Sequence, residues 1–451
     1  MKILPTIGPV SEKIIDIEKI LKMTDIVRIN GSHNVLSWHE NISNRIKKIN
    51  KNSRILLDIP GVKPRTQNSK NIEIKKNQNI TFIFRNNNNT NSENLIITCS
   101  NKIPKITKKP NLISLDDGKY SFKVITIGKD YILAKSLESF ILKPKKGINI
   151  PLAIYDDDFQ NKQYSKFLKK SKKIKYDAIG LSYVQSGKII QKIKKNFPEK
   201  LIISKIENLE GLKNYKKIIE YSDGIMIDRG DLSAEIGDEN LYLSIIKIAD
   251  ETKRSGKPLI MATENLISMN SRLKPTKSEI MSLGLAQQID VDIIMLSDET
   301  AILKNWLAIL AWLKNYLKKT ITLSKIDKKS QHKNDIFWNM VEKLPDIPII
   351  IFSKKGFALN KIKQFKQNSK LIIFSDSNKT IALGSFRKNT ACYKVKKFNK
   401  NNFSIFIKKT ITDYNKIIFK NSNLASLIYI AYPEKNSRAN TISILTKKEF
   451  I

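Results

Sequence analysis

The sequence predicts an α/β protein: a (β/α)₈ (TIM) barrel with a small inserted β domain and a C-terminal α/β domain. Three observations predict this fold. Short β-rich runs alternate with longer segments of helical periodicity, eight such units occur before residue 323, and a long segment rich in strand signals interrupts them. A chain of 451 residues is also too long for one core, so we expect two or three domains.

The eight predicted barrel strands are residues 3–7, 25–30, 54–59, 177–183, 201–207, 223–228, 258–263 and 292–297. A (β/α)₈ barrel brings the carboxyl ends of its strands to one face, where the active site lies. Polar residues at or just after these ends should therefore form a charged ring. They are Arg28, Asn30, Asp58, Ser182, Lys205, Glu207, Asp231, Thr263, Ser297 and Glu299.

An insertion interrupts the barrel after its third strand. It is far longer than the ~2–6 residues of an ordinary βα loop, so it needs a fold of its own. Residues 79–84 and 131–134 alternate as strands do, and residues 86–89 and 116–118 carry turn signals. We expect a β-barrel-like lid domain at 67–151, over the mouth of a barrel formed by 1–66 and 152–323.

The last part of the chain is predicted to be a separate α/β domain, at 335–451. A polar stretch at 324–334 resembles a linker. Beyond it, the apolar runs 347–352, 371–374 and 426–431 alternate again with segments of helical periodicity.

Charge and composition limit the other functional classes. The chain has 81 Lys+Arg against 42 Asp+Glu, a net charge of +39, but its lysines are spread through every segment. That spread disfavours nucleic-acid binding as the main function, while a basic surface still attracts anionic substrates. No apolar run is long enough for a membrane helix, and Cys99 and Cys392 have no metal-binding or redox spacing. We therefore expect a cytoplasmic protein with no membrane partner.

Two carboxylates and a lysine at the predicted barrel mouth suit phosphoryl transfer, which depends on positioning and on neutralising the moving group. Glu207 and Asp231 offer hard oxygen ligands of the kind that Mg²⁺ prefers, with Mn²⁺ as a possible substitute. Lys205 lies two residues before Glu207 on one strand, so both side chains project to one face. Two alternatives stay open: Lys205 and Glu207 forming only a structural ion pair, and the acids being surface residues.

Several motifs occur at these strand ends in an order and spacing that chance does not produce. The most distinctive is Ser204-Lys205-Ile206-Glu207-Asn208. Others are Thr6-Ile7-Gly8-Pro9, Arg28-Ile29-Asn30-Gly31-Ser32-His33, Asp116-Asp117-Gly118, Arg229-Gly230-Asp231-Leu232 and Ser297-Asp298-Glu299-Thr300. With these motifs the chain resembles the pyruvate kinase family of glycolysis. The resemblance implies Mg²⁺, phosphoenolpyruvate, ADP/ATP and pyruvate as ligands, and a homotetramer.

The resemblance also implies a role for each matching residue. Lys205, Thr263 and Arg28 would be catalytic: the lysine faces the moving phosphoryl group, the arginine holds its oxygens, and the threonine lies on the path of a proton to the enolate carbon. Glu207 and Asp231 would bind the metal. The substrate would be bound by Arg28, Lys205, Gly230, Asp231 and Thr263, and the nucleotide by Arg65, His33, Asn30 and Lys162.

Lys63 stands where the family usually has a glutamate beside a bound K⁺. The K⁺ ligands of the family match Asn30, Ser32, Asp58 and the carbonyl of Ile59. A lysine ammonium would supply the monovalent charge itself, so we expect activity that does not require K⁺. The alternative is one more lysine in a lysine-rich chain.

Other departures from the family pattern bear on activity. Pro60, Ser233, Glu264, Asp298 and Asp228 replace the usual residues, and the last three acids add negative charge to a site that must hold anions. The main hypothesis is an active, Mg²⁺-dependent pyruvate kinase. The alternatives are a catalytically impaired homologue with a regulatory phosphate- or nucleotide-binding role, and a related barrel acting on another enol phosphate or keto acid.

Overall fold

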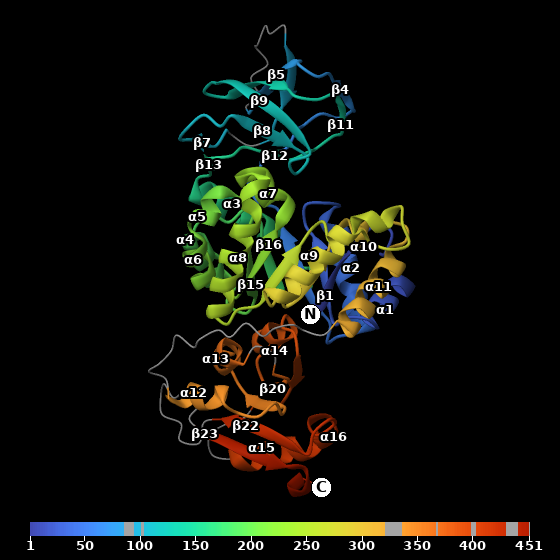
Figure 1. The fold of residues 1–451 in the computed structure, drawn as a ribbon, viewed down its shortest axis with the longest axis vertical. Helices are drawn as coiled ribbons and strands as arrows, with labels where there is room; N and C mark the ends of the chain where they lie inside the picture. The colour runs from blue at the N-terminus through green and yellow to red at the C-terminus, as the bar shows by residue number, and fades with distance from the viewer. Residues whose placement is uncertain are drawn as a thin grey trace.

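The computed structural model describes residues 1–84, 94–100, 103–320, 336–366, 369–397, 403–429 and 441–450. The barrel lies in the middle of the molecule, with an inserted β region at one end and a C-terminal α/β region at the other (Figure 1). The linker predicted at 324–334 and the turn predicted at 86–89 lie outside the described residues.

Eight parallel strands close into a barrel, in the spatial order β1-β18-β17-β16-β15-β14-β3-β2. The ring closes where β18 pairs with β1, with Lys2 opposite Ile293. The strand residues are almost all buried and more than half of them are Ile, Leu or Val, as expected when helices cover the outside of a parallel barrel. The predicted (β/α)₈ fold is confirmed. The strands are β1 (Lys2–Ile7), β2 (Ile26–Asn30), β3 (Arg54–Ile59), β14 (Ala178–Leu181), β15 (Leu201–Ile206), β16 (Gly224–Asp228), β17 (Leu259–Ala262) and β18 (Ile293–Leu296).

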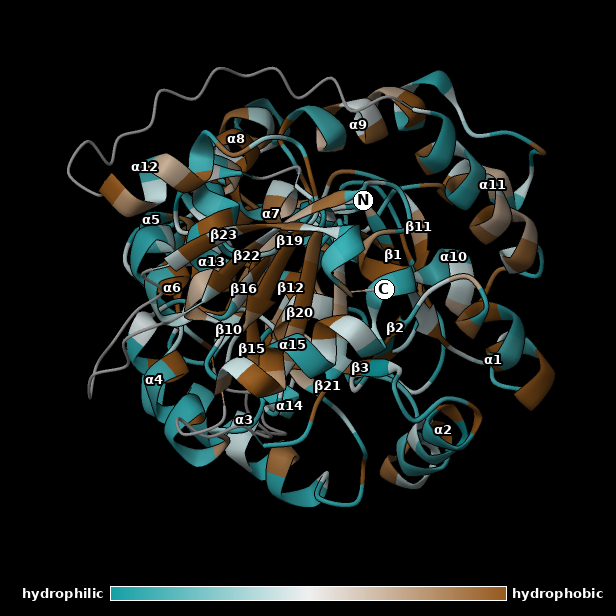
Figure 2. Cartoon of the chain, turned by 90° about the horizontal axis from the view of Figure 1, so that it is seen from below, coloured by the Kyte–Doolittle hydropathy of each residue, from teal (hydrophilic) through white to brown (hydrophobic). Residues whose placement is uncertain are grey.

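Helices surround this barrel and pack their apolar faces on it, as the view from below shows (Figure 2). Several begin with a side-chain cap: Asp156 accepts a hydrogen bond from the Phe159 N–H, and Thr276 and Glu279 form a capping box. The helices are α1 (Ile14–Leu21), α2 (Leu36–Ile49), α3 (Asp157–Lys170), α4 (Gly187–Asn196), α5 (Leu209–Lys213), α6 (Tyr215–Tyr221), α7 (Arg229–Ile236), α8 (Asp238–Arg254), α9 (Lys277–Gln288), α10 (Asp298–Ala301) and α11 (Trp306–Lys319), with the 3₁₀ turn η1 (Ile267–Asn270).

The inserted region consists of strands β4 to β13 and has a core of its own, in which the rings of Phe82 and Phe122 pack edge to face. Its largest sheet has the order β12-β8-β9-β10-β5-β6, and β12 packs on α7 at the barrel mouth. The limits 67 and 151 of a lid domain stay a prediction. The strands are β4 (Ile72–Ile74), β5 (Asn79–Ile83), β6 (Leu95–Thr98), β7 (Lys105–Ile106), β8 (Leu112–Leu115), β9 (Tyr120–Ile127), β10 (Tyr131–Ser136), β11 (Phe140–Leu142), β12 (Ile148–Asn149) and β13 (Ala153–Ile154).

The C-terminal region is a five-stranded sheet of order β21-β20-β19-β22-β23, parallel except for its last pair. One apolar cluster joins it to the barrel interior, since Leu4 and Met226 belong to the same cluster as Trp338 and Ile349. The elements are α12 (Ile336–Glu342), β19 (Ile349–Phe352), α13 (Phe357–Phe365), β20 (Leu371–Ser375), α14 (Asn378–Ser385), β21 (Thr390–Lys394), α15 (Phe403–Asp413), α16 (Asn415–Ile418), β22 (Leu424–Tyr429), β23 (Thr441–Thr446) and η2 (Lys447–Phe450).

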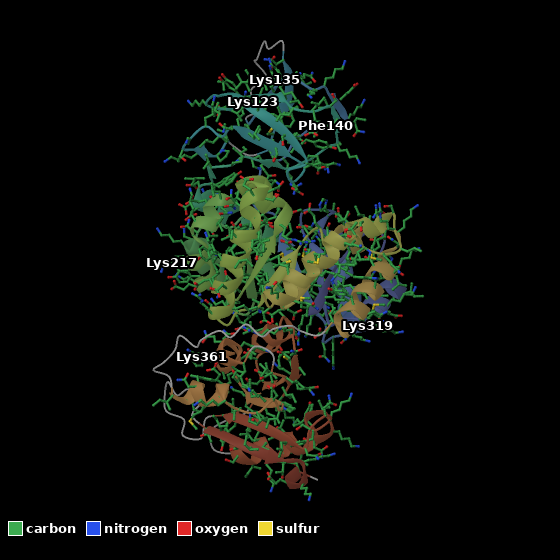
Figure 3. The ribbon with its side chains drawn as sticks, viewed as in Figure 1. Lys123, Lys135, Phe140, Lys217, Lys319 and Lys361 are labelled. Carbon is green, nitrogen blue, oxygen red and sulfur yellow. The ribbon has the colours of Figure 1, made fainter. Side chains whose placement is uncertain are left out.

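Within the described residues, no helix combines the length and the apolar character needed to cross a bilayer. Lysines are found on all three parts of the molecule: Figure 3 labels Lys123 and Lys135 on the inserted region, Lys217 and Lys319 on the barrel, and Lys361 on the C-terminal region.

Two glycines form a matched pair for testing how the C-terminal region docks. Gly256 has φ +63°, and an added Cβ would lie 2.2 Å from the carbonyl oxygen of Asn360 on α13, whereas a Cβ at Gly284 in α9 would meet nothing within 4 Å. We expect Gly256→Ala to destabilise the protein by about 1–3 kcal/mol. Gly284→Ala should stabilise it by about 0.5–1 kcal/mol, because alanine favours a helix interior. Thermal unfolding midpoints measure both, and an unchanged midpoint for Gly256→Ala would contradict this account of the junction.

Candidate active site

Lys205 lies at the centre of the barrel mouth and is almost completely buried. Its ammonium is 2.6 Å from Glu207 Oε1, 3.2 Å from Asp228 Oδ2 and 3.4 Å from Asp58 Oδ2. These carboxylates come from the ends of β15, β16 and β3, far apart in the sequence. Closure of the barrel therefore brings these strand-end side chains together, as expected. The ion pair between Lys205 and Glu207, which the sequence left open as a purely structural role, is present as well.

The lysine charge is maintained by its neighbours. Burial by itself would lower the pKa of Lys205, but Asp58, Glu207 and Asp228 raise it well above the usual range. Burial would likewise raise the pKa of Asp58, and the charges of Lys205 and Arg28 lower it. The lysine and Asp58 are therefore both ionised across the physiological range.

Arg28 projects from β2 beside this lysine. Its Nε and Nη2 lie 2.9 Å and 2.8 Å from Asp58 Oδ2, and its Nη1 donates to Thr6 Oγ1 at 2.9 Å and to Ser297 Oγ at 3.4 Å. Ser182 Oγ holds the other oxygen of Asp58 at 3.1 Å. The guanidinium is thereby fixed in one orientation beside Lys205, which leaves two cations adjacent at the mouth.

Three carboxylates beside these cations have oxygens close enough for one metal ion: atoms of Glu207, Asp228 and Asp231 all lie within 4.8 Å of one another. Burial, together with the neighbouring Asp228 and Asp231 charges, raises the pKa of Glu207 despite its contact with Lys205. Burial also raises the pKa of Asp231, and Asp117 and Asp228 add to that effect. Such crowding of hard oxygens is relieved by a divalent cation, so the residues fit the Mg²⁺ expected from the sequence.

Lys63 reaches the metal-site side of the mouth. Its ammonium lies 2.7 Å from Asp117 Oδ1 and also contacts Asp231 Oδ1. Burial would lower the pKa of Lys63, but these two carboxylates raise it, and the lysine lowers the pKa of Asp117 to about 2. Lys63 thus links the inserted region, which contains Asp117, to α7, which contains Asp231.

The residues predicted to match a K⁺ site are neighbours in the barrel. Asn30 and Asp58 are register partners of β2 and β3, and Ile59 follows on β3. The Asn30 side chain accepts a hydrogen bond from the Ser32 N–H at 3.0 Å. The ion pairs of Lys63 among the described residues go to Asp117 and Asp231 and not to these residues.

Thr263 begins a strained turn immediately after β17. Thr263 and Glu264 have φ angles of 60° and 49°, a left-handed conformation that is costly for residues with a side chain. Thr263 Oγ1 donates to Asp228 Oδ1 at 3.0 Å and accepts a hydrogen bond from the Gly230 N–H at 3.4 Å. The turn thus aims the threonine hydroxyl at the carboxylate cluster and sets it beside the start of α7.

The turn is held from two sides. Arg229 contacts the carbonyl of Thr263 and donates to Asn265 Oδ1 at 3.0 Å. Glu299 accepts hydrogen bonds from the Asn265 and Leu266 N–H groups at 3.1 Å and 3.3 Å. Backbone strain that several surrounding contacts hold in place is characteristic of functional sites.

The residues predicted to bind a nucleotide are less tightly grouped. Arg65 Nη1 donates to the Lys145 carbonyl at 3.1 Å. The pKa of His33 is lowered by burial and then by the charges of Arg65 and Arg28, so these three residues are within electrostatic reach of one another. Lys162 is exposed on α3, where its described charge partner is Asp158, and no described contact joins it to the rest.

The structure adds residues that the sequence did not single out as site residues. The sequence assigns no role to Asp117, although it lies in the Asp116-Asp117-Gly118 motif, and it distinguishes Asp228 only as an extra acid. A buried network also lies behind Asp231: Asn149 Nδ2 is 3.1 Å from Asp231 Oδ1 and 3.3 Å from Glu235 Oε1, which accepts from Tyr183 Oη at 2.9 Å. No spacing in the sequence links residues this far apart.

Fold and site together define a class of protein: a (β/α)₈ barrel with two cations beside a cluster of carboxylates at its mouth, an arrangement suited to phosphoryl transfer. The sequence model of the family "Pyruvate kinase, barrel domain" matches residues 1–305. The chain belongs to the pyruvate kinase family, a family of glycolytic enzymes.

Relatives agree with that assignment. A pyruvate kinase of Thermococcus litoralis is 28% identical over 405 residues, covering 84% of this chain and 85% of that protein. A "Pyruvate kinase, cytosolic isozyme" of Nicotiana tabacum is 30% identical over 315 residues, covering 66% of this chain but only 62% of that protein. The crystal structure of pyruvate kinase from Pyrobaculum aerophilum superposes with a TM-score of 0.81 over 99% of this chain and 98% of that one, at 21% identity, which supports the fold.

Glu235 provides a pH test of the buried network. Burial raises the pKa of Glu235 to about 7, above the usual 4.5, so the folded state holds a proton that the unfolded state releases. Glu235 therefore makes its full contribution to the free energy of unfolding below about pH 4.5. This contribution, on the order of 3 kcal/mol, is lost as pH rises through about 7. Glu235→Gln keeps the acceptor oxygen and should reduce this loss. Denaturant unfolding between pH 5 and pH 8 measures it, and parallel pH profiles for the two proteins would contradict the expected titration.

Proposed function

We propose that this protein is an active pyruvate kinase, which transfers the phosphoryl group of phosphoenolpyruvate to ADP and gives pyruvate and ATP. The observation that carries the proposal is the position of the Lys205 ammonium, 2.6 Å from Glu207 and beside the fixed guanidinium of Arg28. In this arrangement two cations face the place where a phosphoryl group would move.

Glu207 and Asp231 would hold Mg²⁺ or Mn²⁺, with Asp228 as a third nearby carboxylate. When bound, the metal supplies positive charge to the phosphate oxygens. Lys205 would neutralise the moving phosphoryl group, and the Arg28 guanidinium, held beside it by Asp58, would bind its oxygens. The Gly230 N–H, at the start of α7, would bind the substrate carboxylate and orient the substrate.

Thr263 would complete the reaction on the carbon side. Once the phosphoryl group has left, the enolate carbon must gain a proton, and the Thr263 hydroxyl lies at the barrel mouth beside Asp228. ADP would lie on the side of Arg65 and His33, with Asn30 nearby and Lys162 as an outer contact. We also propose a cytoplasmic location and a homotetramer, both expected from the family.

A second candidate function rests on one observation: Lys205 already has three carboxylate partners, and Asp228 is one that the family pattern lacks. Extra negative charge at this point weakens the attraction for an anionic substrate. The alternative is therefore an impaired homologue that binds phosphate or nucleotide in a regulatory role.

We also propose that activity does not require K⁺. Lys63 places a permanent, almost buried positive charge in the site, through its contacts with Asp117 and Asp231. This charge would take over the electrostatic role of the monovalent cation, even though its partners in the structure are not the residues expected from the sequence.

Turnover tests the main proposal. Purified protein with phosphoenolpyruvate, ADP and Mg²⁺ should form pyruvate, followed by coupled oxidation of NADH. Lys205→Met should lower kcat by about 10²–10³ or more, because a charge that acts in the transition state is removed. Lys217→Met is the matched control, since Lys217 is a surface lysine of α6 (Figure 3) whose side chain is 70% exposed. Absence of turnover in the natural protein, with ADP still bound, would favour the regulatory alternative.

Dependence on K⁺ tests the role of Lys63. Rates in tetramethylammonium chloride and in KCl should agree within about twofold, because the lysine charge is always present. Lys63→Glu removes that charge and should make the rate rise when KCl is added. Strong stimulation of the natural protein by K⁺ would refute the proposal.

A further inference from the structure

A small cavity lies at the opposite end of the barrel from the candidate active site, against the C-terminal region. Its volume is about 10 Å³. Lys257 lies two residues before β17 and Asp292 directly before β18, so they mark the amino-terminal ends of those strands. The lining residues are Lys253, Gly256, Lys257, Asp290 and Asp292 from the barrel and Lys363 and Arg387 from the C-terminal region.

Positive charge exceeds negative charge around this cavity. Of the lining side chains, four are cationic and two are carboxylates. Both carboxylates are already engaged: Lys253 lies 2.6 Å from Asp292 and 3.4 Å from Asp290, and Lys388 also contacts Asp290. Arg387, by contrast, forms no ion pair within the described part of the chain. An excess of buried positive charge is costly unless an anion balances it.

Arg387 adds a second, independent sign of a ligand. It is 1% exposed, and its Nη2 donates to the Gly256 carbonyl at 2.5 Å and to Asn360 Oδ1 at 2.6 Å. Its Nε–H is buried and has no hydrogen-bond partner among the described atoms. A buried guanidinium donor left unsatisfied is rare, because the desolvation penalty of a charged group is large.

We propose that this cavity binds a single small inorganic anion of halide size, held between the barrel and the C-terminal region. The volume is about that of one water molecule, so phosphate and sulfate are too large. A halide, only slightly larger than water, accepts hydrogen bonds from several N–H groups at once. A water molecule would satisfy the Arg387 donor without offsetting the charge.

The proposal implies a pH dependence. Burial lowers the pKa of Lys363 to about 7, with Arg387, Lys388 and Lys253 lowering it further and Asp292 opposing them. The other charged groups that line the cavity are Asp290 and Lys257. A bound anion stabilises the protonated form of Lys363, so affinity for the anion should be high below pH 7 and should fall as pH rises above it.

The bound anion would also strengthen the junction between the two regions. Arg387 and Lys363 belong to the C-terminal region and Lys253 and Lys257 to the barrel, and an anion between them turns mutual repulsion into attraction. The midpoint of thermal unfolding of the full chain should therefore rise with chloride concentration, and above the dissociation constant the stabilisation should grow with the logarithm of that concentration.

Crystals of the full chain grown in sodium bromide test the proposal directly. We expect an anomalous scattering peak in the cavity, next to Arg387 Nε. A water molecule there without anomalous signal, or an empty cavity, overturns the proposal.

Unfolding experiments give a second test in solution. Sodium chloride and sodium gluconate are compared at equal ionic strength, and only chloride should raise the midpoint with the concentration dependence of a single binding site. Lys363→Met should weaken the apparent chloride affinity about tenfold or more, since a charge-assisted contact is removed. Lys361→Met, on the same helix but outside the cavity lining, should leave it unchanged (Figure 3). Equal unfolding midpoints in the two salts would contradict the site, and so would equal chloride affinities of the Lys363→Met and Lys361→Met variants. If Lys363→Met fails to fold, the bromide crystal decides.

Discussion

The architecture of the barrel mouth depends on one buried ammonium group. Asp58, Glu207 and Asp228 come from three different strand ends, and closure of the barrel forces them together. Three carboxylates in so small a buried volume repel one another strongly unless a cation lies among them. Lys205 provides that cation. The charge that stabilises the folded mouth is therefore the same charge that would face a phosphoryl group in the proposed function.

The two ends of the barrel carry opposite excesses of charge. At the mouth carboxylates are in excess, cationic side chains compensate for part of their charge, and the proposed divalent metal would compensate for more. At the amino-terminal end cations are in excess, and the proposed halide would compensate for them. The inserted region touches the first end through Asp117, and the C-terminal region covers the second through Arg387. Each appended region thus contributes charge to the end that it covers.

The fold could be predicted from the sequence because it follows from local patterns, and the same patterns led us to expect the strand-end residues at one face of the barrel. Apolar runs gave every barrel strand, and residues 54–59 match β3 at both ends. The strands β14, β15, β17 and β18 end one or two residues earlier than predicted, since residues such as Glu207 and Thr263 leave the ladder to face the site. Lys63 shows the limit: its flexible side chain contacts Asp117 and Asp231, and no local pattern identifies which acids a lysine reaches. The Arg387 cavity was not predicted, because its residues come together only through docking of two regions.

A crystal structure of the full chain with Mn²⁺ tests the central claim most directly. We expect an anomalous peak bound by oxygens of Glu207 and Asp231, with the Lys205 ammonium still beside Glu207 at the mouth. A peak at any other place, or a Lys205 side chain turned away from these carboxylates, would contradict it.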